Sequence, residues 1–341
     1  MPHAMGWRLG LVLALLAGAV LANAAIGAVA ISPGHILQSL AQRLGLLASA
    51  DIAPGQALIL WSIRLPRLVV GILVGAGLAV SGALMQAVFR NPLAEPGLTG
   101  ISAGAAVAAA AAIVLGGSVV GSLSLPPVAF AGAVIAFAAV YVIARSAGPA
   151  QALTLILAGI AVNAIAWSLL GYLTFISDDT QMRNLTFWTM GSLGGSTWSM
   201  VPPLLVVVGG GIFVACRLGG LLNVYQLGEA EAGHLGIDAA RLRLGAMALA
   251  ALIVGACIAV SGQINFLGLV VPHLVRLWQG PDHRTLLPMA AGIGALLLLS
   301  ADLVSRTIIA PAELPIGLVT AFIGAPFFIY LLVRQTRQSG H

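Results

Sequence analysis

The chain has 341 residues, of which 60% are hydrophobic and only 7% are charged, and its mean hydropathy is +1.06. Soluble domains carry about a quarter charged residues, so this composition excludes an ordinary soluble globule and indicates a protein of the lipid bilayer. The formal net charge is +5, and all fifteen basic residues are arginines. They lie scattered at the ends of apolar runs, as topology signals do, which argues against a nucleic-acid partner.

Ten apolar runs follow one another along the chain, most of them near the length of about 20 residues that a helix needs to cross a bilayer. They predict an all-α integral membrane protein in which residues 1–341 form a single transmembrane domain. The eighth run, GQINFLGLVVPHLVR, is broken by Gly268 and Pro272. The predicted spans are 9–31, 66–89, 97–116, 126–144, 151–176, 198–216, 244–261, 262–276, 285–302 and 316–333.

The first run begins after Arg8 and contains Ala22-Asn23-Ala24, a small-residue pattern that also occurs at signal-peptide cleavage sites. This run has 23 residues and is longer than a usual signal core, so we interpret it as a retained first span. The segment that follows, from His35 to Ser62, is predicted to be external, with room for a short helix.

Ten spans place both termini on the same side of the membrane, and the arginines indicate which side. Five arginines fall in one set of loops, namely Arg43, Arg64, Arg67, Arg183 and Arg306, and the other ten fall in the opposite set. Cytoplasmic loops carry the excess of basic residues, so we expect both termini in the cytoplasm.

An internal repeat supports this count of spans. Val74–Gly82 reads VGAGLAVSG and Val254–Gly262 reads VGACIAVSG, with seven identities in nine positions at an offset of 180 residues. Helices rich in small residues can also match by chance. In the ten-span topology the two segments run in opposite directions, so the repeat is inverted, and the transport pathway is expected near the interface of the two halves.

The sequence contains no pattern typical of a catalytic or metal site. There is no phosphate-binding GxxxxGK[ST] loop, and a chain without lysine cannot have one. The six histidines are dispersed without metal-ligand spacing, and we expect a structural or interfacial role for His273. Cys216 and Cys257 lie in or beside apolar runs and are expected to be packing residues. We therefore expect no enzyme activity and no bound cofactor, and any energy must come from a partner.

The segment from Arg64 to Gly104 carries a recognisable series of motifs. It contains RLPR, SGALMQ and NPLAEP, together with the glycine ladder Gly71, Gly75, Gly77 and Gly82, which lets membrane helices approach closely. These motifs resemble those of the FecCD-type permeases, the membrane subunits of ABC importers for iron-siderophores, haem and cobalamin. The resemblance covers residues 60–333. It implies a type II ABC importer permease in the bacterial inner membrane that pairs with a second copy of itself, two ATPase subunits that bind ATP and Mg²⁺, and a periplasmic binding protein.

The longest polar stretch, Leu218 to Arg243, lies on the arginine-rich side and reads as two short helices joined near Gly233–Gly236. Composition alone is equally consistent with a solvated loop. Within it, QLGEAEAGHLG resembles the family's coupling segment, which docks on the ATPase. The resemblance implies contact residues at Gly228, Glu229, Ala232, Leu235 and Gly236.

Arginines on the outer side are candidates for docking the binding protein. Arginine presents a planar fork that suits carboxylates, and in the cobalamin importers of the family matching arginines meet acidic residues of the binding protein. The resemblance assigns this role to Arg64 and Arg67, and through ADLVSR to Arg306. The alternatives are interfacial snorkelling and, for Arg306, an ion pair with Asp302 one helical turn away.

The fifth span and the loop after it are the expected lining of the pathway. Polar groups at membrane depth usually face a cavity or another helix, and helix packing remains the alternative here. The candidates on this span are Asn163, Trp167, Ser168, Tyr172 and Thr174. By resemblance, the fifth and tenth spans of two subunits enclose the pathway.

The substrate is expected to be haem, because RNLTFWTMGSLGGSTW resembles the haem permeases of the family; ferric siderophores and cobalamin are the alternatives. Arg183 could then meet a haem propionate, or else pair with Asp178 or Asp179. Nearby apolar and aromatic surface would come from Met182, Trp188 and Met190.

Two other classes of protein fit the sequence less well. An ion-coupled secondary transporter would need acidic residues near the bilayer centre, whereas Glu95, Asp302 and Glu313 fall near predicted span ends. An intramembrane enzyme would need a nucleophile with its base, or metal ligands, within the spans, and the sequence shows neither.

Overall fold

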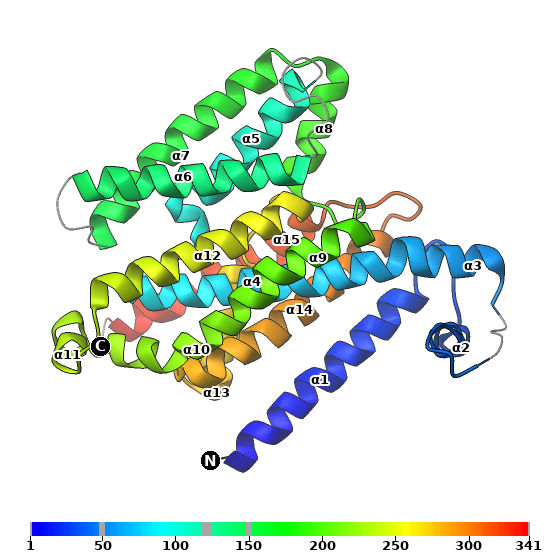
Figure 1. The fold of residues 1–341 in the computed structure, drawn as a ribbon, viewed down its shortest axis with the longest axis horizontal. Coiled ribbons are helices and arrows are strands. Elements are labelled where there is room, and N and C mark those ends of the chain that lie inside the picture. The colour runs from blue at the N-terminus through cyan, green and yellow to red at the C-terminus, as the bar shows by residue number, and fades with distance from the viewer. Residues whose placement is uncertain (1, 48–51, 117–124, 147–151, 340–341) are drawn as a thin grey trace.

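The computed structural model describes residues 2–47, 52–116, 125–146 and 152–339, and every regular element in them is a helix (Figure 1). The long helices are α1 (Pro2–Ala25), α4 (Leu65–Phe89), α5 (Ile101–Leu115), α6 (Leu125–Ser146), α7 (Ala152–Phe175), α10 (Gly210–Tyr225), α12 (Ala239–Ser261), α13 (Leu267–Gln279), α14 (His283–Thr307) and α15 (Ile316–Ser339). Shorter elements are α2 (Pro33–Arg43), α3 (Pro54–Ile59), η1 (Leu60–Arg64), η2 (Pro96–Thr99), α8 (Asp179–Met190), η3 (Trp198–Met200), α9 (Val201–Leu204), η4 (Leu205–Gly209) and α11 (Glu229–His234).

Each of the ten predicted spans coincides with helix, which confirms the all-α fold. Seven described helical stretches are long and apolar enough to cross a membrane: Gly6–Ala25, Pro54–Phe89, Leu125–Ser146, Leu153–Phe175, Trp198–Tyr225, Ala239–Ser261 and His283–Thr307. The other three are shorter: α5, the Ile316–Tyr330 part of α15, and α13 with its 13 residues. The second predicted span is longer than expected, because α3, η1 and α4 form one helical stretch of 36 residues.

Helix α4 runs through the middle of the molecule and is buried along almost its whole length (Figure 1). It packs against α10, α12, α13 and α14. Glycines make this possible: a Cβ atom added at Gly75 would lie 2.4 Å from the carbonyl oxygen of Gly294, and one added at Gly82 would lie 1.8 Å from that of Gly268. The backbones of neighbouring helices are therefore in direct contact, as expected for membrane helices joined through small residues.

The two copies of the internal repeat lie against each other on α4 and α12. These helices are antiparallel, because Arg90 at the end of α4 lies 4.0 Å from Glu229, shortly before α12 begins. Gly77 and Cys257 hold equivalent positions of the repeat, and a Cβ atom at Gly77 would lie 2.8 Å from the Cys257 sulfur. Gly75 packs on α14, and its equivalent Gly255 packs on Ala133 of α6. The structure therefore has the inverted arrangement that the repeat predicts.

Helix α13 is fixed to α4 by a side chain that replaces a missing backbone donor. Pro272 has no N–H to offer the carbonyl of Gly268 four residues earlier. Gln86 of α4 donates from Nε2 to this carbonyl at 3.2 Å and to that of Leu269 at 3.3 Å. Arg276 in turn donates to the Oε1 atom of Gln86. The break that the sequence predicted in this span is thus bridged by its neighbour.

Two local predictions were wrong. The segment 218–243 does not contain two separate short helices, because α10 continues to Tyr225, where Leu222 and Tyr225 extend its buried face, and only α11 is short. The polar segment after the fifth span is not a loop: Asp178 and Gln181 form a capping box that starts helix α8.

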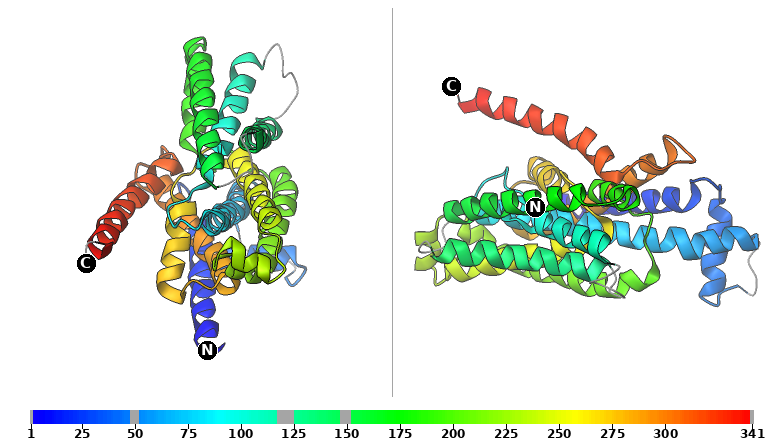
Figure 2. Two further views of the ribbon diagram at one scale, coloured as in Figure 1. Left: turned by 90° about the vertical axis from the view of Figure 1, so that its left-hand side faces the viewer. Right: turned by 90° about the horizontal axis from the view of Figure 1, so that it is seen from above.

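Helix α15 leaves the body of the molecule at an angle (Figure 2).

The glycine contacts predict a clear effect of one methyl group. We expect Gly82→Ala to lower the stability of the purified protein by about 1–3 kcal/mol, because the added Cβ must push α4 away from α13. Gly18→Ala is the matched control, since nothing lies within 4 Å of that position on α1. Thermal unfolding in nanodiscs measures both, and an equal midpoint for the two variants would contradict the packing described here.

Candidate functional site

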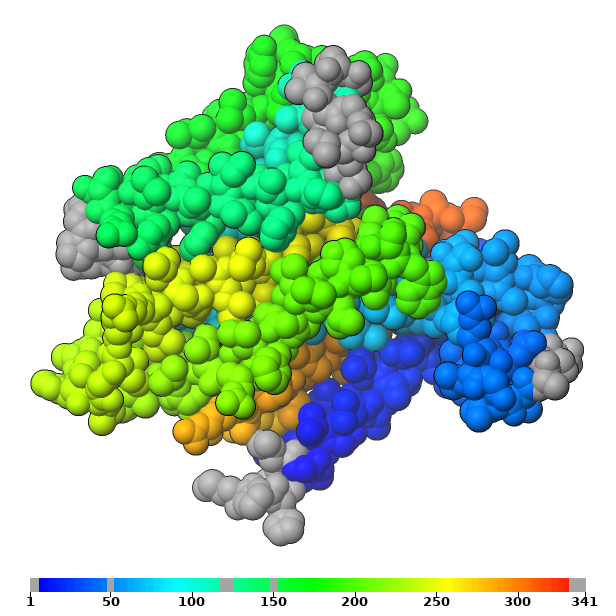
Figure 3. Space-filling view, viewed as in Figure 1, coloured from blue at the N-terminus to red at the C-terminus, as the bar shows by residue number. Residues whose placement is uncertain are grey.

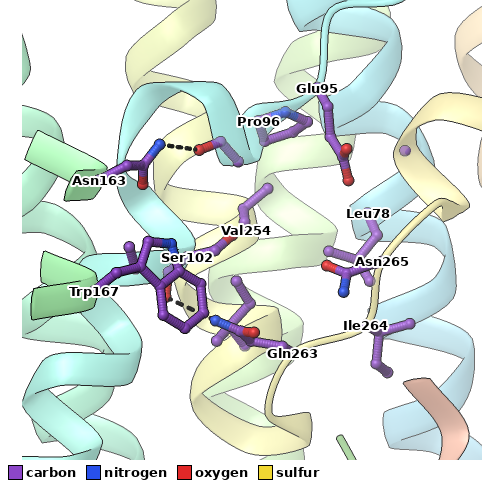
Figure 4. A pocket seen from close by; sticks show the side chains of 14 residues that line it. Leu78, Glu95, Pro96, Ser102, Asn163, Trp167, Val254, Gln263, Ile264 and Asn265 are labelled. Atoms are coloured by element: carbon purple, nitrogen blue, oxygen red, sulfur yellow. Dashed lines mark hydrogen bonds between the residues drawn. The ribbon is translucent and has the colours of Figure 1, made fainter. Parts of the chain in front are cut away.

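A cavity of about 320 Å³, which we call the central cavity, lies between α4, η2, α5, α7, α12 and the start of α13 (Figure 4). Its volume is at the lower end of the range of ligand pockets. Its lining combines apolar side chains of α4 and α12 with a set of polar and aromatic groups, namely Glu95, Ser102, Asn163, Trp167, Gln263 and Asn265.

Two segments outside the α-helices form opposite walls of this cavity. Helix α12 ends at Ser261 and is followed by Gly262, whose φ of +67° glycine adopts readily, and α13 begins after Phe266, whose φ is +69°. On the other wall the connection from α4 to α5 folds back: Pro92 follows the end of α4, and Pro96 begins the short 3₁₀ helix η2. Irregular backbone of this kind is tolerated in membrane proteins where it lines a cavity.

The polar groups of the cavity tie the two walls to the surrounding helices. Asn163 of α7 donates from Nδ2 to the carbonyl of Gly97 at 3.0 Å, and Gln263 donates to the carbonyl of Ser102 at 3.4 Å. The carboxyl group of Glu95 points into the cavity from the connection between α4 and α5 (Figure 4). Glu95 is half-buried there.

The position of Glu95 corrects an expectation from the sequence. Glu95 follows the end of α4, and its place in the sequence suggested a site near the membrane surface. In the structure the segment folds back, so that Glu95 lines the cavity together with Leu78, which lies halfway along α4. An ionisable group therefore does lie at depth, although no pattern in the sequence distinguished it from a residue at a span end.

The residues expected to line the pathway divide into two groups. Asn163 and Trp167 both line the cavity. Tyr172, Met182 and Arg183 are exposed on α7 and α8, and Trp188 and Met190 are half-buried at the end of α8. Arg183 forms no ion pair within the described part of the chain, and Asp178 caps the backbone N–H of Gln181. Sequence reasoning missed Ser102, Gln263 and Asn265; the polar break after α12 was a signal for the last two, and Ser102 lies at the start of α5.

Of the three outer arginines, Arg64 and Arg67 are buried and Arg306 is half-buried, and all three bind groups of the same chain. Arg67 donates to Asp302 from Nε at 3.0 Å and from Nη2 at 2.8 Å, and to both oxygens of Glu313 at 2.9 and 3.0 Å. Arg306 forms the predicted ion pair with Asp302 at 3.3 Å. The docking role expected for these residues stays a prediction; in this structure their guanidinium groups bind acids and carbonyls of the same chain.

The same arginines hold α1 in place. Arg64 donates to the carbonyls of Ala24 and, at 3.0 Å, Ala25 at the end of α1, and to that of Val29 in the segment after it. Arg306 donates to the side chain of Asn23 at 2.9 Å. The last carbonyls of a helix have no hydrogen-bond donor within it and carry partial negative charge. Arginines at this point donate hydrogen bonds to these carbonyls and balance that charge. We call Arg64, Arg67, Asp302, Arg306 and Glu313 the outer clamp.

The predicted coupling residues lie around α11, which protrudes at one edge of the molecule beside α10 and α12 (Figure 3). Glu229 accepts hydrogen bonds from Arg243 at 2.7 Å and from the Tyr225 hydroxyl at 3.1 Å. Ala232 is buried, whereas Leu235 is exposed. Gly228 and Gly236 have positive φ angles of +132° and +78° and form the turns on either side of α11.

Comparison with known proteins gives consistent results. The model of the FecCD transport family matches residues 14–334. The hemin transport system permease HmuU of Yersinia pestis is 46% identical over 290 residues, which is 81% of this chain and 84% of that protein. The vitamin B12 import system permease BtuC of Escherichia coli O127:H6 is 41% identical over 302 residues, which is 89% of this chain and 92% of that protein. A metal-chelate type ABC transporter solved in an inward-facing conformation has a TM-score of 0.83 at 31% identity, covering 98% of this chain and all of that one.

The outer clamp predicts a large loss of stability when its centre is removed. Arg67→Ala removes the bidentate partner of buried Asp302, which keeps only its ion pair with Arg306, and also the partner of exposed Glu313. Breaking a buried ion pair costs up to about 3–5 kcal/mol. Arg241→Ala removes an exposed pair with Asp238 and should cost less than about 1 kcal/mol. Thermal unfolding in nanodiscs compares the two variants. Equal stability would show that Arg67 is not a structural residue.

Proposed function

This chain belongs to the FecCD transport family as an ABC importer permease, and we propose that the substrate it carries across the bacterial inner membrane is haem. The observation that supports haem is the similarity to the hemin permease, which extends over most of both chains. Ferric siderophores and cobalamin are the alternatives, and the vitamin B12 permease of Escherichia coli matches a larger share of the chain at lower identity.

The exposed faces of the molecule support the assembly that we propose. Apolar side chains cover the outer face of α7 and much of α15; Phe175 and Phe322, for example, are 86% and 80% exposed. Some of this surface faces lipid, and we propose that the rest meets a second copy of the chain, so that α7 and α15 of both copies enclose the pathway. A periplasmic binding protein delivers the substrate.

The energy comes from two ATPase subunits, which bind ATP and Mg²⁺ and dock at α11. Exposed Leu235 supplies apolar contact there, and Glu229 is held rigidly by Tyr225 and Arg243. Movement of α11 is passed to α10 and α12, both of which it contacts, and α12 lines the central cavity. In this proposal both termini lie on the same cytoplasmic side as α11.

The proposal predicts the order of substrates in a transport assay. The complete transporter, reconstituted in liposomes with its ATPase and binding protein, should take up haem in an ATP-dependent manner. An excess of ferric siderophore or cobalamin should leave this uptake unchanged. Uptake of cobalamin or of a ferric siderophore in place of haem would overturn the assignment of haem and leave the importer function intact.

Arg183 gives a second, residue-level prediction. It is exposed on α8 without an ion pair within the described residues, so its guanidinium is free to meet a haem propionate bidentately. We expect Arg183→Ala to lower haem transport several-fold while assembly and basal ATP hydrolysis stay intact. Haem dimethyl ester, which lacks the charges, should be transported equally by variant and parent. If the ester suffers the same loss, Arg183 has a structural role.

A further inference from the structure

A second cavity lies outside the candidate site, on the side of the molecule that α1 forms. It has a volume of about 510 Å³, within the range of ligand pockets, and is surrounded by α1, α2 and the first two turns of α4. Every described residue that lines it is apolar, and the side chains of Leu13, Leu21 and Leu37 along it are exposed. This cavity, which we call the α1 groove, is therefore open to the surroundings of the protein.

The helices around the α1 groove are held in place by polar contacts, so the groove cannot close by collapse. Arg64 and Arg306 fix the end of α1, which packs chiefly against α14. Trp61 donates from Nε1 to the hydroxyl of Ser39 at 2.9 Å and so fixes α2. An apolar space that stays empty loses dispersion contacts, and a polar occupant would lose its hydrogen bonds to water there. The groove therefore favours a hydrocarbon chain.

Helix α2 lies at one end of the groove, across the direction of the long helices. It is seen end-on in Figure 1 and runs across the direction of α4 in the view from above (Figure 2). Exposed Gln42 lies on one side of α2. The apolar residues recur on the other side, and the first three of them line the groove: Ile36, Leu37, Leu40 and Leu44. This pattern is typical of a helix that lies in the interface between the hydrocarbon of a bilayer and water.

A cation lies beside the groove at the level of α2. Arg43 follows Leu40 by three residues, which makes the two side chains neighbours on the helix surface. Its guanidinium stacks on the ring of Trp61, with 5.2 Å between Cζ and the ring centroid. Arg43 is exposed and forms no ion pair within the described residues. Tryptophan is enriched at the headgroup level of membranes, and a guanidinium matches the oxygens of a phosphate.

We propose that the α1 groove is a phospholipid-binding site, in which one acyl chain lies between α1 and α4 and the phosphate of the headgroup meets Arg43. Bulk lipid tails are as apolar as leucine, so the groove gains no hydrophobic free energy over the bilayer. Selective binding comes from packing in a preformed groove and from the charge-assisted contact of Arg43 with the phosphate.

The position of the groove favours lipid over a second copy of the chain. The proposed dimer uses α7 and α15, whereas α1 lies on the side of the molecule away from α7 (Figures 1 and 2). With both termini in the cytoplasm, as proposed above, α2 lies at the outer end of α1, and the bound lipid belongs to the outer leaflet. The binding site itself depends on neither haem nor this orientation.

Native mass spectrometry of the complete transporter, stripped of lipid in detergent, tests the acyl-chain site with palmitoyl-oleoyl phosphatidylglycerol as the probe. Ala17→Phe places a ring in the groove, and Ala14→Phe is the matched control at an exposed position of α1 outside it. We expect the affinity for the first lipid bound per permease chain to fall several-fold in Ala17→Phe and to stay unchanged in Ala14→Phe. Equal binding by the parent and both variants would show annular lipid only and would overturn the proposal.

Arg43→Gln tests the phosphate contact in the same assay, with Arg241→Gln of α12 as the exposed control. Arg43→Gln should bind phosphatidylglycerol several-fold more weakly than the parent and Arg241→Gln do. Palmitoyl-oleoyl glycerol, which has the same chains and no phosphate, should bind equally to all three proteins. If Arg43→Gln keeps its affinity for phosphatidylglycerol and instead loses the periplasmic binding protein, Arg43 belongs to a docking surface and the phosphate assignment is wrong.

Should Ala17→Phe not assemble, the parent transporter in nanodiscs still decides the question. Phosphatidylglycerol with a diazirine on its acyl chain should label peptides of α1 and α2 more strongly than those of α6 and α7, and even labelling of all four helices would overturn the proposal. Lack of haem uptake would fail the haem assignment alone, because these measurements need no substrate. Termini found on the outer side would move the lipid to the inner leaflet and leave its binding unchanged.

Discussion

Direct contact between the backbones of α4 and α13 is the constraint on which the rest of the structure depends. It exists because both Gly82 and Gly268 lack a side chain. The contact brings Gln86 close enough to satisfy the carbonyl of Gly268, which Pro272 leaves without a donor. The ring of Pro96 lies 3.6 Å from the position where Gly268 would carry a Cβ, so the same glycine also seats the segment that carries Glu95. Both walls of the central cavity are thus positioned by one point of closest approach.

The helices could be predicted from the sequence because the physics that forms them is local. A run of about 20 apolar residues has few stable alternatives in a bilayer other than a helix. The repeat could be found for a related reason: close packing of α4 and α12 requires small residues, and these leave a pattern such as VGAGLAVSG. Helix α8 shows the limit of this approach, since its start depends on the side chains of Asp178 and Gln181 and not on hydropathy.

The candidate site was less predictable, because its geometry depends on contacts between distant parts of the chain. Asn163 and Trp167 could be identified as polar or amphipathic groups within an apolar helix. Glu95 could not, since the sequence does not show that its segment folds back beside Leu78. Arg67 is a similar case: its motif is visible, but its partner Asp302 is 235 residues away, and only the fold shows that the arginine is satisfied inside the protein.

The outer clamp also has a consequence for how the chain is made. Helix α1 is translated long before α14, yet Asn23 near its end donates to the carbonyl of Leu299 and accepts from Arg306, which follows 283 residues later. Arg64 can bind the carbonyls of Ala24 and Ala25 much earlier, whereas Asn23 lacks these partners until α14 has been made. A chain that terminates before α14 therefore keeps only the Arg64 contacts at this end of α1.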